Sequence, residues 1–277
     1  MSSSARSSRQ SPKVGLFVTC LIDAMRPSAG MAALTLLEAA GCEVVVPESQ
    51  SCCGQPAWNS GDKKAARAVA IPFLESFDDC DYVVVPSGSC AGMLAHQLVE
   101  LFEDAPNPHH RQQALAIATK SHELTSFLVD VLGVKSVPGK IQGRVAYHDS
   151  CSSLREMQVK DQPRQLLKAA GAEVVDLDQA DTCCGFGGTF SVKYGDISGA
   201  MVDSKAEDVE AQQPDLLVAG DMGCLMNIAG RLSRRQSNIA VRHVAEVLAG
   251  EMSAPPIGAG SISSSPIGSS PITSGKE

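Results

Sequence analysis

Short valine-rich runs alternate along the chain with longer segments in which apolar residues recur every three to four positions. The runs lie at 13–19 (KVGLFVT), 43–47 (EVVVP) and 82–86 (YVVVP), and the segments at 28–40 and 62–77 have helical periodicity. This order predicts an α/β fold in which helices join parallel strands by right-handed crossovers. The carboxyl ends of such strands meet at one edge of the sheet, where these folds bind their ligands.

The chain contains this pattern twice. A Cys-Cys-Gly triplet occurs at 52–54 and again at 183–185, an offset of 131 residues. The same offset relates LFVTC, ending at Cys20, to YHDSC, ending at Cys151, and an offset of 134 relates DYVVVPSGSC to DLLVAGDMGC. We therefore expect two tandem homologous domains, each with a short parallel sheet flanked by helices and with cysteines at the carboxyl ends of the strands.

The boundaries of the two copies follow from breaks in the pattern. Gly, Pro and Lys interrupt it at 133–143, which predicts a first cysteine-rich domain at 12–137 and a second at 138–250. Each copy ends with a segment whose apolar residues have helical spacing. We expect this segment to be a helix that begins at a histidine, His122 in the first copy and His243 in the second. The remaining residues, 251–277, are rich in Ser, Gly and Pro with almost no charge, and we expect a disordered tail.

Composition narrows the partners and the compartment. The formal net charge of −8 disfavours sequence-independent binding to nucleic acid or to an anionic membrane. No apolar run reaches the roughly 18 to 20 residues that a membrane span needs, so we expect a protein that does not cross the membrane. We see no secretory signal and expect a cytoplasmic protein, in which clustered thiols bind metal or perform redox chemistry more often than they form disulfides.

Eight of the ten cysteines follow predicted strands, four in each copy. These candidate cofactor and metal ligands are Cys20, Cys52, Cys53 and Cys90 in the first copy, and Cys151, Cys183, Cys184 and Cys224 in the second. Three loops of each copy would thus bring four thiols together. Cys42 and Cys80 have no counterpart in the other copy, and we expect them to be buried as small hydrophobic residues.

The adjacent cysteines suggest which inorganic group is bound. Gly54 and Gly185 relieve the backbone after each pair, so that both thiols of a pair can reach one site. Two neighbouring thiolates can bind different irons of one cluster, whereas a single Zn²⁺ needs four ligands arranged tetrahedrally around it. An iron-sulfur cluster is therefore favoured. Zinc in one or both copies, and structural thiols without a ligand, stay open as alternatives because soft thiolates also select zinc.

The pattern C-x31-CCG-x35-C, repeated in the second half, resembles the cysteine-rich CCG domain family. That family includes the cysteine-rich subunit of heterodisulfide reductase and lactate utilization protein A, and LFVTCLID, CCGQPAWNSG and CCGFGGTFSVK are most similar to the lactate branch. The resemblance implies an iron-sulfur electron-transfer subunit of a complex that oxidises L-lactate to pyruvate, with other iron-sulfur subunits as partners. It also implies an oxidoreductase role in L-lactate catabolism.

The chain departs from the fullest form of that family at one position in each copy. The family pattern ends in C-x-x-C, but here Met93 and Asn227 stand where the last cysteine would be. Four thiolates per copy suit an ordinary [4Fe-4S] cluster in each domain, and a heterodisulfide-reductase-like thiol/disulfide activity is the weaker alternative.

Other residues could act near the clusters. His148, Arg26 and Arg155 lie close in sequence to the first cysteine of a copy and are candidates for tuning a cluster. The sequence contains no catalytic Ser-His-Asp order, flavin fingerprint or paired carboxylates that we can recognise, so catalytic residues stay unassigned. Lactate oxidation moves a hydride or its equivalent, while an iron-sulfur cluster passes one electron at a time, so we expect the hydride chemistry to belong to a partner.

Overall fold

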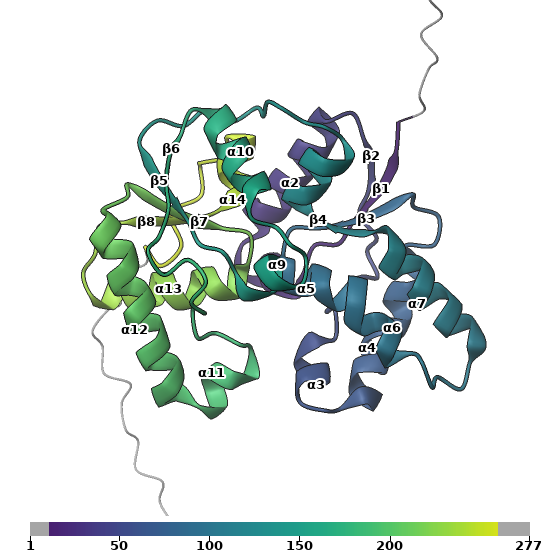
Figure 1. Ribbon diagram of the computed structural model, residues 1–277. Helices are drawn as coiled ribbons and strands as arrows, with labels where there is room; N and C mark the ends of the chain where they lie inside the picture. Colours follow the sequence, from purple (N-terminus) through teal and green to yellow (C-terminus); the bar gives the residue numbers. More distant parts are fainter. Residues whose placement is uncertain (1–10, 260–277) are drawn as a thin grey trace, which may run out of the picture.

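Each copy of the valine-rich pattern forms its own four-stranded parallel sheet. The computed structural model describes residues 11–259 (Figure 1). The first sheet has the order β2-β1-β3-β4 and contains β1 (Lys13–Leu16), β2 (Glu43–Val45), β3 (Tyr82–Val85) and β4 (Ser121–Glu123). The second has the order β6-β5-β7-β8 and contains β5 (Arg144–Tyr147), β6 (Glu173–Val175), β7 (Leu216–Ala219) and β8 (Ala240–His243). The predicted α/β fold with two tandem parallel sheets is confirmed.

Helices and helical turns connect the strands in both halves. The first half contains α1 (Cys20–Met25), α2 (Pro27–Ala39), α3 (Gln55–Asn59), α4 (Lys63–Ser76), α5 (Gly88–Gly92), the π-helical turn η1 (Met93–Gln97), α6 (Leu98–Leu101), α7 (Pro108–Lys120), α8 (Leu124–Ser126) and the π-helical turn η2 (Phe127–Val131). The second half contains α9 (Cys151–Arg155), α10 (Asp161–Ala170), α11 (Thr189–Lys193), α12 (Gly195–Gln212), α13 (Met222–Arg234) and α14 (Val244–Ala249).

Alternation along the strands gives each sheet two buried faces. Val83 and Val85 pack into one cluster with α4, α6 and α7, while Val84 between them faces a different cluster. In the second sheet, Leu217 faces α12 and α13, and Val218 faces the same cluster as Val84. Continuous apolar strands are therefore required, because parallel sheets are covered on both sides.

The cluster common to both sheets is a shared helical layer. It contains apolar side chains from α2, α8, η2, α10 and α14, so helices of both halves contribute to one core. Helix α2 of the first half packs along α14 of the second, and the two lie side by side in Figure 1. Burying apolar area here stabilises the two halves together rather than each one alone. The division between residues 137 and 138 stays a prediction, and residues 133–143 contain no helix or strand.

Equivalent positions in the two halves make equivalent backbone bonds. Phe17 N donates to Val84 O at 2.9 Å directly after β1, and His148 N donates to Val218 O at 2.8 Å directly after β5. The offsets found in the sequence, 131 and 134 residues, relate these donors and acceptors to each other. The repeat is therefore present in the hydrogen bonding as well as in the cysteines.

Contacts between the halves also occur in matched pairs. His243 Nε2 lies 3.0 Å from Pro86 O. At Gly220, the equivalent of Pro86, a methyl group would lie 3.5 Å from a carboxylate oxygen of Glu123. Helix α5 packs on α9, and α13 packs on α1. Each half thus presents the same surface to the other.

One of the two predicted helix starts needs correction. The residue that caps the closing helix of the first half is Glu123, whose carboxylate accepts from Thr125 N and Ser126 N, and His122 lies within β4. In the second half His243 caps α14, as predicted. The strand register explains the shift, since Glu123 pairs with Val85 and His243 with Ala219, the equivalent of Val85.

The segment after residue 250 also differs from the prediction in its described part. Pro255 O accepts a hydrogen bond from Arg26, Ile257 N donates to Val241 O at 2.8 Å, and Ile257 packs on the core of the second half. Residues 251–259 therefore lie against the body of the molecule. The prediction of disorder for 260–277 lies outside the described residues. Within the described part of the chain, none of the helices combines the length and apolarity needed to cross a bilayer.

Candidate metal centre

The first cysteine of each half begins a short helix that follows the first strand after a brief loop. Cys20 is the first residue of α1 and Cys151 is the first residue of α9. Cys20 is exposed and Cys151 is partly buried. The strand therefore delivers one thiol of each half to the edge where the strand ends, as predicted.

The adjacent cysteines lie in loops that end at a glycine with positive φ. Gly54 has φ of 86° and Gly185 has φ of 81°, a conformation that glycine adopts most readily. The turn directs the amide of the glycine back onto the first thiol of the pair, at 3.5 Å for Gly54 N to Cys52 Sγ and 3.4 Å for Gly185 N to Cys183 Sγ. At Gly185 a methyl group would also lie 2.8 Å from Ser198 O. Both the φ angle and the packing thus require glycine.

The last cysteine of each quartet sits in the first turn of the helix that follows the third strand. Cys90 is in α5 and Cys224 is in α13, and both are buried. In the first half Cys53 Sγ lies 3.3 Å from Cys90 Sγ. The helix turn and the cysteine loop thus bring two thiols from distant parts of the sequence into contact.

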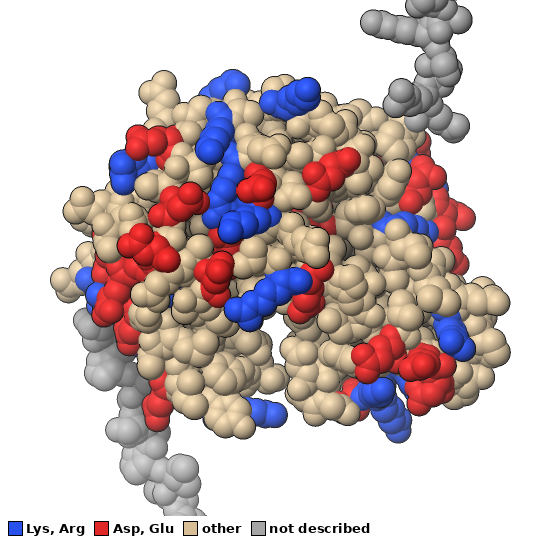
Figure 2. Space-filling view, in the orientation of Figure 1, with Lys and Arg blue, Asp and Glu red and all other residues tan. Residues whose placement is uncertain are grey.

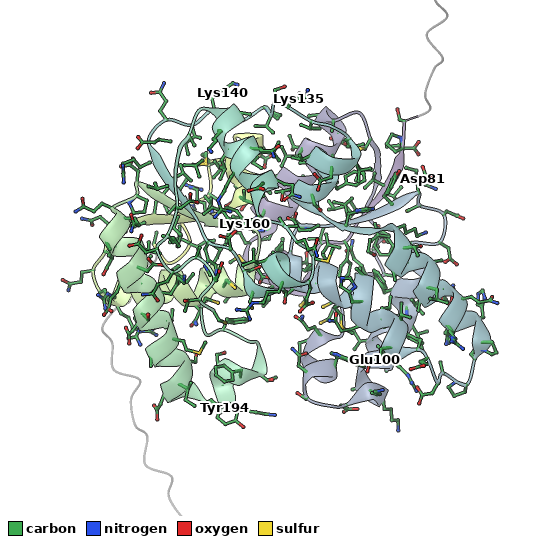
Figure 3. All side chains as sticks on the ribbon, viewed as in Figure 1. Asp81, Glu100, Lys135, Lys140, Lys160 and Tyr194 are labelled. Carbon is green, nitrogen blue, oxygen red and sulfur yellow. The ribbon has the colours of Figure 1, made fainter. Side chains whose placement is uncertain are left out.

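All eight candidate cysteines line a single cavity of about 470 Å³. Four come from each half, and α3 and α11 form part of its wall on opposite sides. Figure 3 labels Tyr194, which directly follows α11, in one lobe and Glu100 of α6 in the other. The space-filling view is notched between these two lobes (Figure 2). The structure therefore gathers the predicted thiols completely. Cys42 and Cys80 lie elsewhere, buried in the hydrophobic cores, as predicted.

Contacts among the thiols determine where negative charge collects. Hydrogen bonds from Cys20 and Cys53 lower the pKa of Cys52 to about 2, and hydrogen bonds from Cys151 and Cys184 lower the pKa of Cys183 to about 2. The same bonds, with burial, raise the pKa of Cys20 and of Cys151. Within each quartet these hydrogen bonds favour the thiolate form of the first cysteine of the adjacent pair, and a bound cation would displace protons from the other thiols.

The donor chemistry fits a thiolate-bound metal or cluster. Each half offers four soft sulfur ligands, the set that iron-sulfur clusters and structural zinc both use. The positions of the missing fifth cysteine are occupied differently. Met93 is fully buried, and Asn227 donates its side-chain amide to Cys184 O at 2.9 Å, which holds the cysteine loop in place.

The three tuning candidates have different surroundings. Arg26 forms a buried ion pair with Glu246 at 2.8 Å, so it joins the halves and does not line the cavity. Arg155 donates to Asp181 O at 3.2 Å and is also absent from the cavity wall. His148 is fully buried, and its nearer ring nitrogen and the sulfurs of Cys184 and Cys224 all lie within 4.8 Å of one another. His148 does not line the cavity either, but of the three it alone lies beside the thiols.

The sequence reasoning missed Asp221, which lines the cavity beside Cys224. Its carboxylate accepts from Ser89 N at 3.1 Å and from Ser87 Oγ at 3.3 Å, both in the other half. The repeat contained the signal, because the offset of 134 residues that relates Cys90 to Cys224 also relates Ser87 to Asp221. A polar residue at this position of both copies marks the junction of the two quartets.

Comparison with known proteins agrees with the duplicated motif. A family of cysteine-rich domains, CCG, matches the chain twice, over residues 14–95 and 145–229. The chain is similar to lactate utilization protein A from Geobacillus sp. (strain WCH70), with 50% identity over 237 residues that cover 85% of this chain and 98% of that protein. It is also similar to lactate utilization protein A from Geobacillus kaustophilus (strain HTA426), with 49% identity and the same coverage. Lactate utilization protein A 2 from Bacillus cereus (strain Q1) is 43% identical over 87% of this chain and 99% of that protein.

Proposed function

Because the chain carries two CCG cysteine-rich domains and belongs to the lactate utilization protein A family, we propose that it acts in lactate utilization as an iron-sulfur electron carrier. The observation that supports this proposal best is the single cavity lined by four thiols from each half. The proposed ligands are Cys20, Cys52, Cys53 and Cys90 for one [4Fe-4S] cluster, and Cys151, Cys183, Cys184 and Cys224 for a second.

Hydrogen bonds from neighbouring groups favour negative charge on each quartet, and negative charge favours the binding of metal cations. Hydrogen bonds donated by neighbouring thiols lower the pKa of Cys52 and of Cys183. The amides of Gly54 and Gly185 point at the same sulfurs and favour their negative charge. Bound there, a cluster would supply one-electron exchange without taking up a hydride.

Two quartets on one cavity suit a reaction that releases electrons in pairs. Oxidation of L-lactate to pyruvate removes two electrons and two protons, which a hydride-accepting partner would collect and pass on singly. We therefore propose a cytoplasmic complex in which this chain receives electrons from, or delivers them to, other iron-sulfur subunits. Cys20 is exposed, so the first quartet is open toward such a partner.

Anaerobic reconstitution with iron and sulfide tests the electron-carrier role. We expect about four irons and four sulfides per quartet, with brown visible absorbance that decreases on reduction. A chain that takes up zinc and no sulfide would contradict the proposal. The lactate role is tested separately: deletion of the chain should abolish growth on lactate, and restoring it should restore growth.

A zinc-stabilised scaffold without redox activity is the second candidate, and one observation favours it for the second half. His148, Cys184 and Cys224 form a histidine-cysteine group of the kind that binds zinc. A mixed protein, with a cluster in the first half and zinc in the second, would show half of the expected sulfide and one zinc per chain. Metal and sulfide analysis of the same anaerobic sample distinguishes these cases.

A further inference from the structure

His148 has no hydrogen-bond partner for its ring although it is completely buried. Neither Nδ1 nor Nε2 is paired with another atom of the described chain, while the backbone amide of the same residue donates to Val218 O. Buried polar groups are normally paired, and an unpaired one needs a specific explanation. The nearest chemical groups that could use the ring are the thiols of Cys184 and Cys224, within the 4.8 Å cluster.

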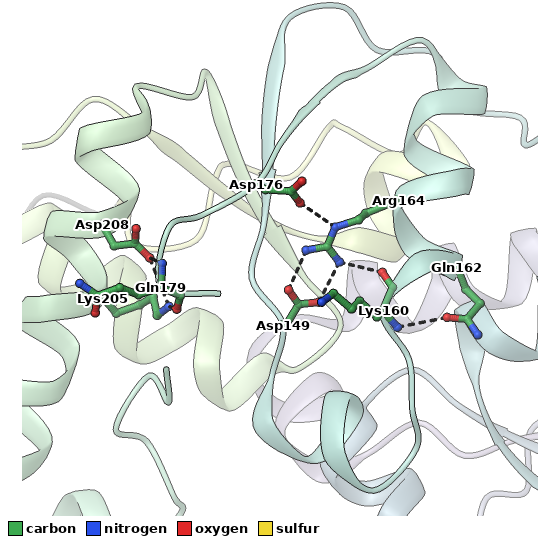
Figure 4. A network of polar contacts seen from close by, with 8 residues as sticks. All are labelled: Asp149, Lys160, Gln162, Arg164, Asp176, Gln179, Lys205 and Asp208. Atoms are coloured by element: carbon green, nitrogen blue, oxygen red, sulfur yellow. Dashed lines mark hydrogen bonds and ion pairs between the residues drawn. The ribbon is translucent and has the colours of Figure 1, made fainter. Parts of the chain in front are cut away.

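The segment around His148 is held firmly on both sides. The preceding Tyr147 is buried, with the guanidinium of Arg164 5.3 Å from its ring centroid. The following Asp149 accepts two hydrogen bonds from Arg164, at 2.8 and 2.6 Å (Figure 4). Arg164 also pairs with Asp176 at 3.0 Å. The backbone that carries His148 is therefore fixed, and the ring is held near the sulfurs without being bonded to its neighbours.

The first half has a different residue at the same place. Phe17 is the equivalent of His148, since both donate their backbone amide to the equivalent residue of the third strand. The ring of Phe17 packs against Phe73 and Phe77, with centroids 5.0 and 6.1 Å apart. A phenyl ring therefore packs well at this position of the fold. The fold itself does not require the imidazole that the second half has there.

We propose that His148 is a positioning residue that donates an N–H hydrogen bond to sulfur of the centre held by the second quartet, and so raises the reduction potential of that centre. This inference rests on the proposed function. A hydrogen bond to sulfur stabilises the extra negative charge of the reduced form. Phe17 can offer no such bond, so the first half lacks this contribution.

The substitution His148→Phe tests this, because Phe17 shows that the backbone accepts a phenyl ring. The variant is made in a Cys53→Ser background, in which only the second centre remains to be titrated. At a fixed applied potential we expect the ratio of reduced to oxidised second centre to fall about tenfold, which corresponds to about 59 mV for one electron. His148→Gln keeps an N–H donor and should retain most of the original ratio. Iron and sulfide content should be unchanged in both variants.

The outcomes separate this inference from the function on which it rests. An unchanged ratio in His148→Phe, with iron and sulfide retained, would overturn the inference and leave the electron-carrier role intact. Loss of iron from His148→Phe, with a native circular dichroism spectrum, would also overturn it, because His148 would then be a ligand. A wild-type chain that binds no iron and sulfide would overturn both.

Discussion

Directly after β1 the first half places Phe17 in a cluster of phenylalanines, whereas directly after β5 the second half places His148 beside two thiols. The loops that carry the paired cysteines differ in the same way. Gln50 holds the first loop by accepting from Val18 N at 2.7 Å with its side chain. In the second loop, the buried Lys205 donates to Gln179 O, and Asp208 accepts from Gln179 N at 3.1 Å (Figure 4).

The difference shows which parts of a duplicated fold are constrained. Strand order, register, the positive φ of the glycine after each cysteine pair and the position of every thiol agree between the halves. The side chains around the thiols and the groups that hold the loops do not. Geometry at the sulfurs is thus shared, while the polarity around them is free to differ and can give each centre its own properties.

Removing one thiol from either half should have the largest effect. Cys53→Ser and Cys184→Ser should each abolish one centre and lower the iron content and visible absorbance by about half, because each quartet supplies its own ligands. Cys42→Ala, which changes a buried cysteine away from the cavity, is the control and should leave both unchanged. Loss of all iron from either serine variant would show that the eight thiols hold one shared group.

Breaking the ion pair behind the second loop should cost the most stability. Lys205 and Asp208 are buried side chains 3.4 Å apart. Lys205→Met leaves Asp208 as an uncompensated buried charge, and we expect the free energy of unfolding to fall by about 3 to 5 kcal/mol in urea denaturation. Lys193→Met, on the exposed surface of α11, is the matched control. A change below about 1 kcal/mol in Lys205→Met would contradict the role given to this pair.

The two equivalent helix caps should respond to pH with opposite signs. Burial raises the pKa of Glu123 to about 7, so the folded state keeps a proton that the unfolded state releases. Its contribution to stability is therefore lost as the pH rises from about 4.5 to about 7, by roughly 3 kcal/mol. Burial lowers the pKa of His243, so its contribution is lost as the pH falls below 6.5.

The opposite pH dependences of Glu123 and His243 can be checked by measuring urea unfolding midpoints at about pH 5 and about pH 7.5. Glu123→Gln should remove the loss of stability toward the higher pH, and His243→Asn should remove the loss toward the lower pH. If both variants kept the pH profile of the unsubstituted chain, neither cap would control the pH dependence of stability.

The smallest effect is expected at the first loop. Gln50→Ala removes the acceptor of Val18 N, a partly buried amide, and should lower the free energy of unfolding by about 1 kcal/mol. Gln50→Glu keeps an acceptor at that position and serves as the control. If Gln50→Ala cost as much as Lys205→Met, the contrast between the two loops would be lost.

Much of the fold could be predicted because the chemistry of the site repeats in the sequence. Valine-rich runs identify the strands, and the placement of Cys20 and Cys90 in loops that follow strands predicts that their thiols meet. The residue that caps the closing helix of the first half was harder to predict from the sequence. His122 and His243 look equivalent in the sequence, but strand pairing aligns Glu123 with His243, because pairing depends on contacts far along the chain.

Contacts between the halves could not be predicted from local patterns. The pairing of Arg26 with Glu246 joins residues 220 positions apart. The sequence places Ile257 in a low-complexity tail, yet it packs on the second half and donates a backbone hydrogen bond to Val241. Composition reports the average polarity of a segment, whereas docking of one isoleucine depends on a surface that only the folded chain presents.

The paired packing of α5 on α9 and of α13 on α1 is the kind that two identical subunits exchange across a two-fold axis. The chain therefore has the geometry of a homodimer whose subunits have been joined end to end. Joining frees each copy to mutate independently, so a residue such as histidine can appear on one side alone. A symmetric dimer cannot make that distinction, because every substitution would appear at both centres.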